Sequence, residues 1–91
     1  MIITTQESIR MELINIKGMA AKSCGIDNIS IGHLRYFSEK MIEFRASIRA
    51  LLLMKSKYDE DSMDYFILEK AINYMKSTKE ERKSLFKVWQ K

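Results

Sequence analysis

The side chains best able to do chemistry in this 91-residue chain are its single histidine and its single cysteine. His33 follows Ser30 by three positions, which places both on one turn of a helix, where a hydroxyl and an imidazole could act as nucleophile and base. Such a pair also needs an orienting acid and a concave site, which a domain of this size rarely provides. Cys24 falls at the expected C-terminal end of a helix, where the dipole disfavours the thiolate. We therefore expect no enzymatic activity and no cofactor.

Carboxylates form the other candidate site. Asp59 opens the run Asp-Glu-Asp-Ser-Met-Asp, which could bind a cation. An EF-hand loop needs glycine at its sixth position and glutamate at its twelfth, but counting from Asp59 these positions hold Asp64 and Lys70. One cysteine and one histidine are also too few for a zinc site. We expect no metal site, and we interpret the acidic run as the start of a helix.

The charge of the chain is unevenly distributed. Its 16 Lys+Arg against 12 Asp+Glu give a formal net charge of +4. Both ends of the chain are basic, whereas the segment 59–69 contains acidic residues and no basic residue. This pattern suits association with nucleic acid through the basic segments, or electrostatic steering toward a protein surface that carries both signs.

Composition predicts a single all-α domain over residues 1–91. The chain contains no proline, which is excluded from helix interiors but common in loops, so we expect helices joined by short turns. The longest unbroken apolar run, 50–54, is far shorter than the roughly 20 residues that span a bilayer. With a single cysteine and no signal-like start, the sequence predicts a cytoplasmic protein that does not enter a membrane.

Apolar spacing and capping signals predict the first helix. Thr4 and Glu7 have the spacing of a capping box, and Gly25 is suited to end the helix at about Cys24. Between them, one stripe recurs every three or four residues and should face the core. Its members are Ile9, Leu13, Ile16, Ala20 and Cys24.

The second helix is expected to be long, from about Asn28 to about Lys57, with Asn28 or Ser30 as its cap. At 1.5 Å per residue it would measure about 45 Å, longer than a compact monomer of this size is wide. It must therefore protrude, break, with Gly32 as its weak point, or be covered by a second copy. Its apolar residues alternate at steps of three and four, as in a heptad repeat. This seam could be buried inside one bundle or shared between two chains, and the length of the helix favours a homodimer. The seam consists of Leu34, Phe37, Met41, Phe44, Ile48 and Leu51.

Two further helices complete the expected bundle of about four. One runs from Ser62 to Lys76 and is apolar on most of its surface, which predicts a central position. A short last helix can begin with a capping box of Ser77 with Glu80 or of Thr78 with Glu81. Trp89 in this helix could fill the core or anchor a partner.

The segment 17–36 resembles the helix-turn-helix motif of bacterial and phage regulators. Ala21 supplies the small residue where the second helix crosses, and Gly25 supplies the turn four residues later. The corner should bury Ala20, Cys24, Ile26, Ile31 and Leu34. Small activators of the lambdoid-phage CII type share this order of an N-terminal helix, the motif and further helices. The resemblance implies a small phage- or plasmid-type transcriptional regulator that binds double-stranded DNA.

The resemblance also implies which residues contact DNA. Asn28 could read adenine, and His33 could donate a hydrogen bond to a base edge, while lysines and arginines contact phosphates. The implied set is Lys17, Lys22, Asn28, Ser30, His33, Arg35, Tyr36, Arg45 and Arg49. The alternative is that the corner is purely structural. The chain would then be a non-enzymatic helical module that binds another protein, such as an inhibitor, an adaptor or an immunity protein, and does not bind DNA.

Overall fold

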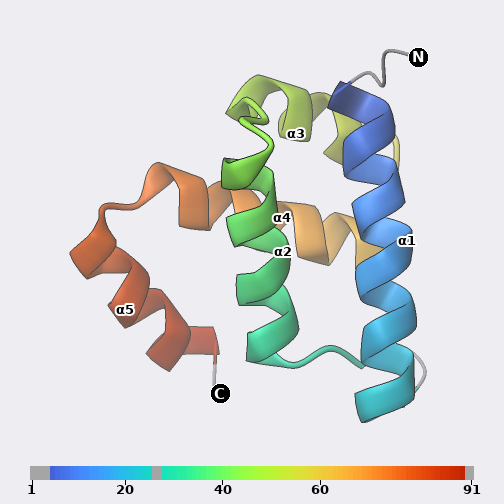
Figure 1. Cartoon of the computed structure of the whole chain (residues 1–91), viewed down its shortest axis with the longest axis horizontal. Helices are drawn as coiled ribbons and strands as arrows, with labels where there is room; N and C mark the ends of the chain where they lie inside the picture. The colour runs from blue at the N-terminus through green and yellow to red at the C-terminus, as the bar shows by residue number, and fades with distance from the viewer. Residues whose placement is uncertain (1–4, 26–27, 90–91) are drawn as a thin grey trace.

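The computed structural model describes residues 5–25 and 28–89, which contain helices and no strand, as the composition predicts (Figure 1). These residues form five helices, where about four were expected. The Thr4 end of the first expected capping box lies outside these residues. The helices are α1 (Thr5–Cys24), α2 (Ile31–Glu43), α3 (Ile48–Lys55), α4 (Met63–Lys76) and α5 (Lys79–Trp89).

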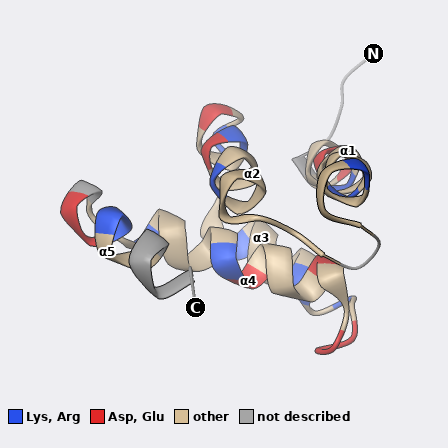
Figure 2. Cartoon of the chain, turned by 90° about the horizontal axis from the view of Figure 1, so that it is seen from below, with Lys and Arg blue, Asp and Glu red and all other residues tan. Residues whose placement is uncertain are grey.

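The first two helices lie side by side and antiparallel, and α4 runs across them (Figures 1 and 2). Of the five helices, α4 has the most extensive contacts, since it packs against α1, α2 and α3. The central position expected for this segment is therefore confirmed. α5 follows at the end of α4 that lies away from α1 (Figure 1).

The inner face of α1 is the one that the apolar spacing predicts. Ile9, Leu13, Ile16 and Ala20 are all buried, whereas Cys24, expected on the same stripe, is exposed. The helix ends immediately after Cys24, because Gly25 adopts a left-handed conformation with φ of 92°. The last residue of the stripe therefore extends beyond the core.

The prediction of one long helix over 28–57 is wrong, because the chain turns between α2 and α3. Arg45 has φ of 59°, and its N–H donates to the carbonyl of Ile42, while the N–H of Ala46 donates to the carbonyl of Met41. These two bonds form a Schellman motif with arginine in the position that glycine usually occupies. Ser47 then caps α3 by accepting a hydrogen bond from the N–H of Ala50 at 3.0 Å.

The turn divides the predicted heptad seam. Leu34, Phe37, Met41 and Leu51 are buried within a single chain, so most of the seam is a core seam. Phe44, which forms the C-cap of α2, is 45% exposed. A continuous helix of about 45 Å would also exceed the longest dimension of the molecule, 39 Å.

Serine and threonine side chains set the starts of the last two helices. Ser62 caps α4 by accepting from the N–H of Tyr65, so this helix begins where the acidic run predicts. Before α5, the N–H of Thr78 donates to Glu81, and the N–H of Glu81 donates to the Thr78 hydroxyl. Of the two boxes that the sequence allows here, Thr78 with Glu81 is formed, and its hydrogen bonds lower the pKa of the Glu81 carboxyl.

Within the described residues, no helix combines the length and apolar character needed to cross a membrane.

Candidate functional site

The segment 17–36 differs from a helix-turn-helix corner at two points. The connection from Cys24 to Ile31 is longer than the three- or four-residue turn of that motif, and α1 and α2 lie antiparallel instead of crossing steeply (Figure 2). Ala21 and Cys24, expected at the buried crossing, are exposed, although Ala20 and Leu34 are buried as expected. Ile26 lies outside the described residues.

Three of the residues expected to contact bases instead cap helix ends. Asn28 donates from Nδ2 to the carbonyl of Cys24 at 3.1 Å, which satisfies the last turn of α1. The Ser30 hydroxyl accepts from the N–H of His33, and His33 Nδ1 accepts from the N–H of Ser30. The two side chains also meet directly, with Oγ and Nδ1 2.7 Å apart. Because Nδ1 is an acceptor in this capping box, the neutral ring carries its proton on Nε2.

One of the two α1 lysines expected to contact phosphate forms an ion pair with a carboxylate of the same chain. Lys17 Nζ lies 2.9 Å from Asp64 Oδ1, so this ion pair joins the middle of α1 to the first turn of α4. Lys22, at the end of α1, is exposed. Basic and acidic residues are interspersed on α1 and on α4 (Figure 2).

Arg35 belongs to a chain of polar contacts that links three helices. Its Nε lies 3.2 Å from Glu39 Oε1 within α2, and the Tyr74 hydroxyl of α4 donates to the same oxygen at 3.2 Å. On the other side of Tyr74, Arg82 of α5 lies 4.5 Å from the ring centre. Burial raises the pKa of the Tyr74 phenol, and the negative charge of Glu39 raises it further. Both arginines oppose this shift.

Tyr36 remains accessible on the outer side of α2. Its side chain is half-exposed, and the Lys40 ammonium lies over its ring at 5.6 Å from the centre. Of the predicted residues at this helix, Ser30 and His33 bond to each other at its start, whereas Arg35 and Tyr36 are exposed and contact Glu39 and Lys40.

Exposed apolar and basic side chains gather in the stretch 42–53. Arg45 and Arg49 are exposed, and among the described residues neither has a carboxylate partner. Leu53 is 50% exposed, and Leu52 and Phe44 are nearly as accessible. Because α3 is only about 12 Å long, all of these side chains lie close to the turn. We call this set the corner surface: Ile42, Phe44, Arg45, Arg49, Leu52 and Leu53.

Three apolar residues of the corner surface were absent from the predicted site: Ile42, Leu52 and Leu53. A signal for the two leucines exists in the sequence, because the unbroken apolar run 50–54 covers more than one turn of a helix and cannot all face one core. Leu51 and Met54 take the buried side, which leaves Leu52 and Leu53 outside.

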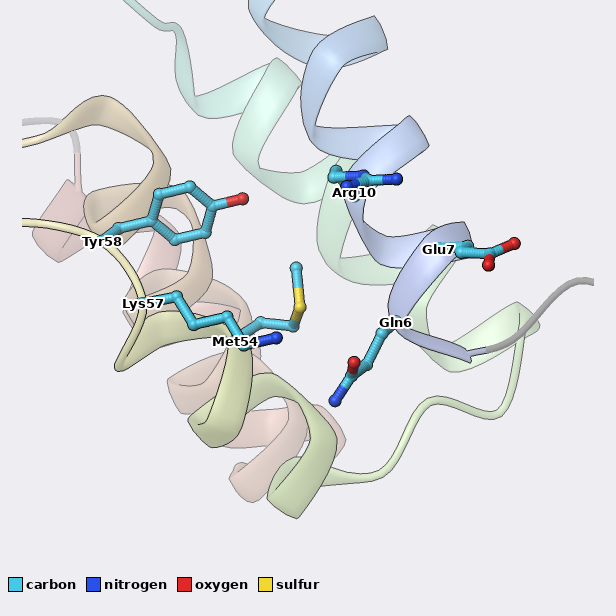
Figure 3. A pocket seen from close by; sticks show the side chains of 6 residues that line it. All are labelled: Gln6, Glu7, Arg10, Met54, Lys57 and Tyr58. Atoms are coloured by element: carbon cyan, nitrogen blue, oxygen red, sulfur yellow. The ribbon is translucent and has the colours of Figure 1, made fainter.

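A groove of about 470 Å³ opens between the start of α1 and the end of α3. A guanidinium, an ammonium and a phenol contribute to its walls, and the carboxylate of Glu7 points away from Lys57 and Tyr58 (Figure 3). The described residues that line it include no thiol or imidazole. The lining residues are Gln6, Glu7, Arg10, Met54, Lys57 and Tyr58.

Across residues 5–25 and 28–89, no group of three His, Cys, Asp or Glu side chains is placed to hold a metal ion. The side chain of Trp89, the expected core plug or partner anchor, lies outside those that the structure describes. No family model, no curated protein and no solved structure matches the chain.

Proposed function

We propose that this chain is a non-enzymatic helical module that binds another protein through the corner surface. The observation that carries the proposal is the exposure of large apolar side chains beside Arg45 and Arg49. Aromatic and arginine residues are enriched at the energetic centres of protein interfaces, and exposed apolar clusters commonly mark contact surfaces.

The chemistry of the corner surface specifies the kind of partner. Phe44, Leu52 and Leu53 favour a partner that offers apolar side chains, and the two arginines favour carboxylates at its margin. An amphipathic segment with acidic residues along its border meets both requirements. We therefore propose an acidic, amphipathic protein segment as the ligand.

Binding to duplex DNA is the competing proposal, since Lys22, Arg45 and Arg49 are exposed cations. It has less support, because Asn28 Nδ2 and His33 Nδ1 already bond within helix caps, which fixes both side chains against the backbone. A phosphate-binding surface would also gain little from the leucines that flank Arg49, whereas a protein interface would bury them.

The test is affinity purification with three versions of the chain. The wild type should retain one partner at a one-to-one ratio, and Leu53→Lys should lose it. Met19→Lys is the control, because Met19 is also an exposed apolar residue but lies on α1. Arg49→Glu should weaken binding, and reversal of an acidic residue in the partner should restore it. All these residues are exposed, so the substitutions should change the free energy of unfolding by no more than about 0.5 kcal/mol.

A parallel titration with random duplex DNA decides between the proposals. Affinity that falls steeply with salt, and that is lost in Arg45→Glu and Arg49→Glu but not in Leu53→Lys, would favour DNA and overturn protein binding through the corner surface. Equal loss of a protein partner in Leu53→Lys and Met19→Lys would also contradict the assignment of this surface.

A further inference from the structure

We propose that the outer face of α1 pairs with α1 of a second copy of this chain, in antiparallel orientation, with Ile14 at the centre of the contact. This surface is separate from the corner surface, so the inference does not depend on the proposed function. The heptad seam that predicted a homodimer is largely buried within one chain, and self-association therefore requires a different face.

The outer face of α1 is apolar along one line. Met11 is 59% exposed and Ile14 is 63% exposed, the two highest values among the large apolar side chains of the described residues. Gly18 and Ala21 follow at steps of four and three and are also exposed. This spacing is that of a helix-packing stripe, and it lies opposite the stripe that faces the core.

The sizes of these residues are self-complementary in one antiparallel register. A two-fold axis that passes between Ile14 and Asn15 brings the two Ile14 side chains together. It also sets Met11 of each copy at the height of Gly18 in the other. A Cβ atom added at Gly18 would meet nothing within 4 Å, so the space above this residue is open to a partner side chain. Each methionine would then fill the gap over the facing glycine.

The charges agree with the same register. The axis that pairs Met11 with Gly18 also pairs Glu7 with Lys22, at both ends of a contact about 22 Å long. A parallel arrangement would instead place Glu7 beside Glu7 and Lys22 beside Lys22, which is unfavourable. In this register a large side chain faces a small one, and an acidic residue faces a basic one. An isologous interface, in which one surface meets its own copy, requires this complementarity. This complementarity of the face with itself identifies a second copy as its occupant.

The experiment is the measurement of molecular mass by sedimentation over a range of concentrations up to about 0.5 mM. The wild type should shift from monomer to dimer. Ile14→Lys should remain monomeric, since two ammonium groups would meet at the axis. Gly18→Leu should weaken the dimer at least about tenfold by blocking the site of Met11. The same substitution should raise the melting temperature of the monomer, because leucine favours a helix more than glycine does.

Exchange of the end charges tests the register. Glu7→Lys alone and Lys22→Glu alone should each weaken the dimer about 3- to 10-fold, and the double variant should recover most of the affinity. Leu53→Lys, on the corner surface, is the control and should leave the dimer unchanged. A wild type that stays monomeric over the whole range overturns the proposal. So does a dimer that persists in Ile14→Lys, or a double variant no tighter than the single ones.

Discussion

Arg82 of α5 binds Tyr74 of α4 in two ways at once: its guanidinium lies 4.5 Å from the centre of the ring, and its Nε donates to the backbone carbonyl at 3.0 Å. The main helix contacts of the core involve α1 to α4, and α5 lies beyond them at the end of α4 (Figure 1). Arg82 therefore attaches the first turn of α5 to the last turn of α4.

Replacement of this arginine should loosen α5 without unfolding the rest of the molecule. In Arg82→Ala, we expect hydrogen exchange of the α5 amides to accelerate about 5- to 30-fold, since a cation–π contact and a charged hydrogen bond are lost. Amides of α1 and α2 should exchange as in the wild type. Lys83→Ala, which changes an exposed neighbour, serves as the control. Equal acceleration in both variants would mean that Arg82 does not attach α5.

Tyr74 should make the fold sensitive to alkaline pH. Because burial and Glu39 raise the pKa of its phenol in the folded state, the folded chain holds the proton more tightly than the unfolded chain. This contribution to stability is complete below the unfolded value of about 10 and is lost as the pH rises through the folded value. In an absorbance titration of phenolate, one of the four tyrosines should ionise late, and Tyr74→Phe should remove that phase.

The Tyr74→Phe variant also separates the effect of phenol ionisation from the effect of ring packing. At neutral pH it should cost about 0.5 to 1.5 kcal/mol, because the hydrogen bond to Glu39 is lost while the ring remains. Above pH 10 or so, the stability of the variant should decline less steeply than that of the wild type. A late titration phase that survives in Tyr74→Phe would assign the raised pKa to another tyrosine.

Arg45 should be a position where glycine stabilises the fold. Its left-handed conformation, with φ of 59°, costs an ordinary residue about 1 to 2 kcal/mol, and glycine adopts it freely. Part of the gain is offset by the greater freedom of glycine in the unfolded chain, so Arg45→Gly should stabilise by about 0.5 to 1 kcal/mol in urea unfolding. Arg45→Ala removes the same side chain but keeps the strain, and it should give no gain.

Phe37 and Phe44 provide the sharpest test of the turn between α2 and α3. They are seven residues apart, yet Phe37 is fully buried and Phe44 is on the surface. Phe37→Ala should cost about 3 to 5 kcal/mol of unfolding free energy, and Phe44→Ala less than about 1 kcal/mol. Similar large losses at both positions would indicate a continuous seam and contradict the turn.

Most of the helical elements follow from local chemistry in the sequence. Ser62 and the pair Thr78 with Glu81 are capping signals whose partners lie three residues away, and the structure forms both. The break at Arg45 could not be foreseen in the same way, because a left-handed residue at a helix end is usually glycine. The position of the break is set by the residues that follow Arg45: Ala46 is buried beside the end of α2, and Ser47 caps the next helix.

The candidate site was less predictable than the fold. Ser30 was expected as a helix cap, and the structure confirms it. His33 also fitted a reactive pair or a DNA contact, and only the hydrogen bonds show that its ring completes the cap. Lys17 is 47 positions from Asp64, so nothing local indicates that its charge is compensated. Leu52 and Leu53 lie outside the predicted seam, but only the turn before them places them on the same corner as Phe44 and Arg45.

The position of α4 has a consequence for how the chain is synthesised. Because α4 is the common neighbour of α1, α2 and α3, the apolar faces of those helices have no shared cover until it is present. A nascent chain that has reached residue 62 exposes Leu13, Phe37 and Leu51 together, and such uncovered faces associate readily. We therefore expect the newly made chain to stay accessible to chaperones until α4 has left the ribosome and packed against the first three helices.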